Sequence, residues 1–193
     1  MSDLKLPVNA AEYPKTTAAR LAMTDIAARY MEEYAQALDC LGAEDRMQKK
    51  ALSIQLHMAQ HCHTFAAMGY NSSLWEEQIA RRTSMLKRSR FFGEYASALS
   101  DLSEDERGAF IQYVHTAWML HNAFIDKHLA HLRAVIDAGQ PEKAFEDRII
   151  LGTVYAICRE WRQWWTDNGP IPFEHWTYED LPFPERESEA DHG

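Results

Sequence analysis

The fold class is decided by residues 103–139, SEDERGAFIQYVHTAWMLHNAFIDKHLAHLRAVIDAG. Ser103 and Glu106 have the spacing of a capping box, in which each side chain binds the other residue's backbone N–H at a helix start. Behind this box, apolar and histidine side chains recur every three or four residues, and Gly139 is a typical helix end. The pattern predicts one helix over 104–138. Such a helix would be about 50 Å long, so a kink or a break within it is plausible.

The same periodicity predicts most of the remaining chain to be helical. Helices are expected over 17–41, with Thr16 or Thr17 as the N-cap, and over 44–68. A second capping box, Ser73–Glu76, opens another helix before residue 99, and Gly93 would kink or break it. A last helix has Pro141 in its first turn and ends near residue 168. We find no pattern typical of strands.

These elements predict an all-α protein with one domain over 1–169, built as a bundle of five or six helices. Residues 170–193 form a different region, because four prolines exclude a helix and favour an extended or polyproline conformation. This tail carries a net charge of −6 of the total −9 at pH 7. Its last residues, from 185 onward, have the composition of a disordered end.

Composition places the 193-residue chain among globular proteins, with 46% hydrophobic and 25% charged residues. No stretch of signal-peptide type precedes residue 14. The charge-free stretches 51–75 and 110–125 contain many His, Gln, Asn, Thr and Ser residues, which argues against a membrane span. Three widely spaced cysteines, Cys40, Cys62 and Cys158, indicate reduced thiols in a cytoplasmic protein.

Histidines provide one candidate site. His57 and His61 are four residues apart and so project from one helix face, a spacing at which two imidazoles can bind one metal ion. His121 and His128 share roughly one face of the long predicted helix. If the two helices pack together, these four side chains could bind a transition metal such as Zn or Fe. Buried, hydrogen-bonded histidines without a metal are the more common outcome for this composition.

Two further groups of residues are candidates for a binding surface. A basic run without acids could contact a protein partner or, less favourably, a nucleic acid, although a solvated helix face or contact with the acidic tail explains it equally simply. The aromatic C-terminal region is typical of interface anchors, or of a tail that folds back on the body. The candidate surface comprises Arg81, Arg82, Lys87, Arg88, Arg90, Trp165, Trp176, Tyr178 and Phe183.

Catalytic motifs are missing: the sequence has no Gly-x-Ser-x-Gly, no His-Glu-x-x-His and no glycine-rich phosphate loop. We therefore assign no catalytic residues. The leading hypothesis is a non-enzymatic protein that binds another macromolecule, without a cofactor, as an adaptor, regulator or inhibitor of a larger assembly. A protein partner is favoured, and self-association is an open alternative. The rival is a histidine-ligated metalloprotein. A third hypothesis is a small-ligand pocket lined by Met58, Phe65, Trp118 and Phe124.

Overall fold

The computed structural model describes residues 13–67 and 100–170, except for the side chain of Trp118. All regular structure within these residues is helical, which confirms the all-α prediction. The predicted helix that follows Ser73, and the predicted tail from residue 171 onward, lie outside the described residues.

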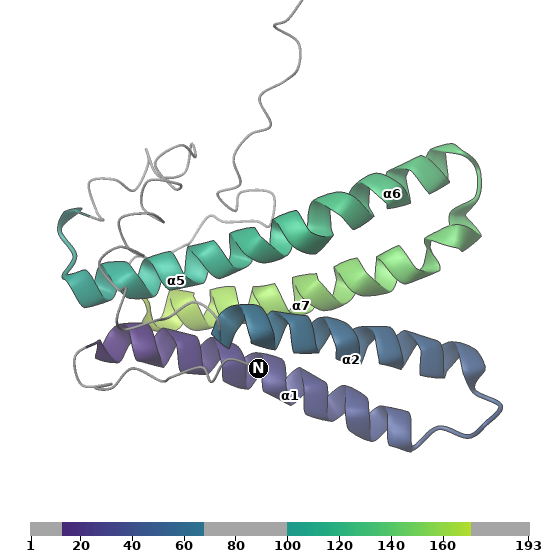
Figure 1. Ribbon diagram of the computed structural model, residues 1–193, viewed down its shortest axis with the longest axis horizontal. Coiled ribbons are helices and arrows are strands. Elements are labelled where there is room, and N and C mark those ends of the chain that lie inside the picture. Colours follow the sequence, from purple (N-terminus) through teal and green to yellow (C-terminus); the bar gives the residue numbers. More distant parts are fainter. Residues whose placement is uncertain (1–12, 68–99, 171–193) are drawn as a thin grey trace, which may run out of the picture.

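Helices α1 (Pro14–Asp39) and α2 (Arg46–Ala67) form an antiparallel hairpin (Figure 1). Helix α1 begins at Pro14, ahead of the predicted start at residue 17, because proline's fixed φ and missing N–H suit a first turn. In the connection, the backbone N–H of Gly42 donates to the Asp45 carboxylate at 3.0 Å. Helix α2 then begins directly after Asp45, slightly later than predicted.

The predicted helix over 104–138 is present but not uniform. It runs as α5 (Glu104–Leu120), a π-helical turn (His121–Ile125) and α6 (Asp126–Asp137). A π-helical turn holds an extra residue, so the side chains beyond it are rotated by about 100° relative to an uninterrupted α-helix. This turn is therefore the interruption expected from the length of the helix. Gly139, with a φ of 69°, ends the rod in the left-handed conformation that glycine tolerates.

Helix α7 (Phe145–Asn168) returns antiparallel to this rod (Figure 1). A 3₁₀ turn (Pro141–Ala144) precedes it, so Pro141 opens that turn and not the α-helix itself. Within the described residues, α1, α2, α5 and α7 surround one core, whereas α6 packs mainly against α7 and contains no fully buried residue. The α1–α2 hairpin and α7 both reach the end of the bundle where α6 lies (Figure 1), and there Lys50 of α2 pairs with Glu146 of α7.

The core joins α1 to α7 through a polar contact as well as apolar packing. Trp161 is fully buried, and its indole N–H donates to the backbone carbonyl of Met23 at 2.9 Å. Burying a side chain of this size contributes several kcal/mol, and the hydrogen bond removes the cost of burying the indole N–H. Among the described helices, none has the length and apolar character needed to cross a membrane.

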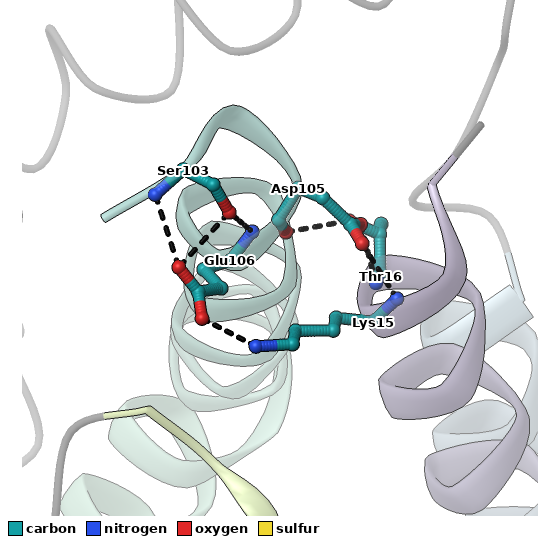
Figure 2. Close-up of polar contacts among 5 residues, drawn as sticks. All are labelled: Lys15, Thr16, Ser103, Asp105 and Glu106. Carbon is teal, nitrogen blue, oxygen red and sulfur yellow. Dashed lines mark hydrogen bonds and ion pairs between the residues drawn. The ribbon is translucent and has the colours of Figure 1, made fainter.

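Helix α1 receives its N-terminal cap from α5 (Figure 2). The predicted caps are wrong, because Thr16 lies inside the first turn and the N-cap position is occupied by Tyr13, which makes no side-chain cap. Instead, the Asp105 carboxylate accepts hydrogen bonds from the backbone N–H groups of Lys15 at 2.8 Å and Thr16 at 2.9 Å. The Thr16 hydroxyl donates to the same carboxylate at 2.8 Å. The starts of the two helices are thereby joined.

The capping box predicted at the start of α5 is confirmed. The Ser103 backbone N–H donates to the Glu106 carboxylate at 3.0 Å, and the Glu106 backbone N–H donates to the Ser103 hydroxyl at 3.3 Å. Glu106 also pairs with the ammonium group of Lys15 (Figure 2). Hydrogen bonds from Lys15 and Ser103 lower the pKa of Glu106 to about 2. Glu106 is therefore ionised at neutral pH and complements both helix N-termini.

Candidate functional site

Most of the predicted binding surface falls outside the described residues. This applies to Arg81, Arg82, Lys87, Arg88, Arg90, Trp176, Tyr178 and Phe183. Their role in binding stays a prediction.

The assignment of Trp165 to a binding surface is wrong. Its side chain is 1% exposed, on the face of α7 that meets α5. The indole stacks on Tyr113, with centroids 5.3 Å apart, and meets Phe110 edge-on at 5.8 Å. Helical spacing from Trp161 places Trp165 on the same buried stripe. Trp165 is therefore a core residue that fixes α7 against α5.

His57 and His61 do come together, as their spacing predicts. Their Nε2 atoms lie 3.0 Å apart and their rings are nearly perpendicular. His57 is exposed, whereas His61 is half-buried against Phe124 of the π-helical turn, with ring centroids 5.1 Å apart. Burial, and to a smaller degree the neighbouring His57, lowers the pKa of His61. His61 is therefore a neutral imidazole at pH 7, the form that binds metals.

His121 and His128 make other contacts. His121 Nδ1 lies 3.5 Å from the Asp126 carboxylate, and His128 Nδ1 lies 2.7 Å from the Asp147 carboxylate on α7. The π-helical turn begins at His121 and rotates His128 off the face that the sequence pattern assigned to both. Across residues 13–67 and 100–170, no three His, Cys, Asp or Glu side chains are grouped to bind one metal ion. The four-histidine site with Zn or Fe stays a prediction.

A histidine–carboxylate cluster connects α6 to α7. Asp147 has a side chain only 7% exposed, and each of its oxygens accepts a hydrogen bond from the Nδ1 of a histidine, His128 or His131. Burial alone would raise the pKa of Asp147, but the hydrogen bonds from the two histidines outweigh it and lower that pKa. Both histidines are thereby held with Nδ1 toward Asp147.

Sequence reasoning did not select Asp147. His128 and His131 are three residues apart on one helix face, and a short connection ending in proline and a new helix follows. This arrangement signals an antiparallel hairpin in which the first turns of the second helix face those histidines. A carboxylate at residue 147 is then within their reach.

A second missed cluster joins α1 to α7. The Tyr30 hydroxyl donates to the Glu160 carboxylate at 2.5 Å, and the Arg29 guanidinium pairs with the same carboxylate. Burial and the neighbouring Glu160 raise the pKa of Tyr30, so its hydroxyl stays a donor throughout the neutral range. The cluster lies on the outer side of the bundle and adds polar contacts between helices far apart in sequence.

Three of the four residues expected to line a small-ligand pocket pack as hydrophobic residues of the bundle. Met58 is buried in the core, and Phe65 contacts Phe124 edge-on with centroids 6.2 Å apart. The side chain of Trp118 lies outside those described. These contacts are those of ordinary core packing.

Comparisons of the chain with protein-family models, with curated proteins and with solved structures found no match in any of the three.

Proposed function

We propose that this chain is a non-enzymatic helical protein that binds another protein, as an adaptor, a regulator or an inhibitor of a larger assembly. In this proposal the bundle has five or six helices, the acidic tail extends from it, and the protein works in the cytoplasm. The proposal is carried by helix α6, which among the described helices packs mainly against α7 and contains no fully buried residue.

Helix α6 is amphipathic but only partly covered. Leu129 and Leu132 pack partly buried against the core, and Val135 is half-buried. Ile136, near the end of the same helix, is 48% exposed. An amphipathic helix with an incompletely covered apolar side is a common way to present aliphatic side chains to a partner.

Charge favours a protein partner over a nucleic acid. The whole chain has a net charge of −9, and the surface of α6 mixes acids and bases, among them Asp126, Lys127, Arg133 and Asp137. A polyanion gains little from such a surface, because its binding depends on concentrated positive charge. The run Arg81–Arg90 is the local exception in the sequence and is included in the proposed surface.

The test compares matched exposed residues. Ile136→Asp on α6 is paired with the control Leu21→Asp on α1, since Leu21 is similarly exposed at 46%. A partner is identified by its co-purification with the wild-type chain, and its binding is then measured with both purified proteins. The proposal predicts weaker binding by Ile136→Asp and by the double variant Arg81→Glu, Arg88→Glu, but not by Leu21→Asp. Equal binding by all four correctly folded proteins would contradict it.

A second candidate function, histidine-ligated binding of a transition metal, is supported by one specific observation. The Nε2 atoms of His57 and His61 already lie 3.0 Å apart on α2. Its general test is metal uptake by the purified, untagged chain, measured by elemental analysis.

A further inference from the structure

On α2, the Nε2 atoms of His57 and His61 face each other at a distance that suits two ligands of one metal ion. The two atoms are 3.0 Å apart. If both bound one ion through metal–nitrogen bonds of about 2.0–2.1 Å, the angle between the two bonds at the metal would be about 90°. That is the angle between neighbouring ligands in square-planar and tetragonal complexes, the geometries preferred by Cu(II) and Ni(II). A tetrahedral Zn(II) site would place the nitrogens about 3.4 Å apart.

The surroundings hold this arrangement in place on one side and leave it open on the other. His61 is packed against the Phe124 ring, which limits the rotation of its imidazole. His57 is exposed, so an ion reaches the pair from solvent and keeps its remaining ligands as water. The pair requires no change in the helix, because residues four apart already face each other.

We propose that His57 and His61 form a two-histidine site for a tetragonal divalent ion of the Cu(II) or Ni(II) class. This rests on the second candidate function above and narrows it to one pair, without His121 or His128. Both Nε2 atoms must offer lone pairs to the ion. The Nε2 proton of one ring therefore moves through solvent to the Nδ1 of the same ring, and this change of tautomer releases no net proton.

The alternative explanation of the geometry is a simple N–H···N hydrogen bond between the two rings, which is also 3.0 Å long. The two explanations differ in what happens when an ion is added. A hydrogen-bonded pair that does not bind ions gives no saturable uptake. A chelating pair binds one ion per chain, and the folded protein is then more stable against unfolding when the ion is present.

The experiment titrates Ni(II) into the untagged full chain by calorimetry, and records the Cu(II) electron paramagnetic resonance spectrum. Wild type is compared with His57→Gln, His61→Gln and the control His63→Gln. His63 is on the same helix, but two residues past His61 it points to another side. Circular dichroism confirms that each variant is folded.

We expect one Ni(II) per wild-type chain and a Cu(II) spectrum with two equatorial imidazole nitrogens. His57→Gln and His61→Gln should each weaken Ni(II) binding at least about tenfold. Mutating a residue that only hydrogen-bonds a metal ligand already lowers metal affinity about 10- to 100-fold, and these variants remove a ligand itself. His63→Gln should bind as wild type does. If wild type takes up no ion, both the site and the metal-binding function are wrong. If wild type binds an ion and both His57→Gln and His61→Gln bind it equally well, the proposed site is wrong, and the metal binds elsewhere on the chain.

Discussion

Asp105 on α5 caps the first turn of α1 by accepting hydrogen bonds from the backbone N–H and the hydroxyl of Thr16, 89 positions away in the chain. Helix caps usually come from the residue just before the helix, so they are local. Here the cap is a tertiary contact, and it makes the start of α1 dependent on the position of α5. The first turn of α1 and the packing of α5 should therefore be lost together on unfolding.

Replacing Asp105 by Ala should lower the free energy of unfolding by about 1–2 kcal/mol, the usual cost of a lost N-cap. The reason is that the backbone N–H groups of Lys15 and Thr16 would lose their acceptor. Urea denaturation followed by circular dichroism measures the effect. Glu104→Ala is the control, because Glu104 is an exposed acid in the same turn of α5. Equal losses in both variants would show that general helix-end charge, and not capping, is responsible.

Trp165→Ala should destabilise the fold by about 3–5 kcal/mol, because it removes a buried indole stacked on Tyr113 and leaves a cavity. Thermal or urea unfolding measures this loss. Trp164→Ala, at the half-buried neighbour, is the matched control and should cost clearly less. A Trp165→Ala chain as stable as wild type would show that this indole is not part of the core.

The helical elements could be predicted because their signals are local. The capping box at Ser103–Glu106 and the spacing of apolar residues behind it are both contained within neighbouring turns, and both agree with the structure. Helix ends were less accurate, as the start of α1 shows, because Pro14 and the distant Asp105 together set where it begins.

The site residues were harder to predict because their partners lie on other helices. The spacing of His57 and His61 was sufficient, since both are on one helix. His128 required knowledge of the π-helical turn, and Asp147 required knowledge of which turns of α6 and α7 face each other. Trp165 was misjudged because Trp164 and Trp165, three and four residues after Trp161, both fit the helical spacing, and which of them is buried depends on the neighbouring helices.

The attachment of α6 to α7 should weaken in acid through Asp147. Its pKa is lowered in the folded chain by hydrogen bonds from His128 and His131, against the opposing effect of burial. A lowered carboxylate pKa adds stability that is fully present above about pH 4, the usual pKa of an unfolded Asp, and is lost as the pH falls through the folded-state value. Urea denaturation between neutral pH and acid measures this dependence.

Asp147→Asn should therefore flatten the acid limb of the stability profile, because the amide does not titrate. Asp137→Asn, an exposed position at the end of α6, is the control and should leave that limb as steep as in wild type. A profile of Asp147→Asn that matches wild type throughout would show that this carboxylate does not contribute to the acid dependence.

The three cysteines should differ sharply in reactivity. Cys40 is exposed, whereas Cys62 on α2 and Cys158 on α7 are buried free thiols. Burial raises the pKa of Cys158 to about 12 and raises that of Cys62 well above its ordinary value, so neither forms the reactive thiolate at neutral pH. A disulfide-exchange reagent at pH 8 should thus label one thiol per native chain and all three in denaturant. Cys40→Ser should abolish labelling of the native chain. Rapid labelling of a second thiol in native Cys40→Ser would mean that the contact between α2 and α7 opens far more readily than its packing indicates.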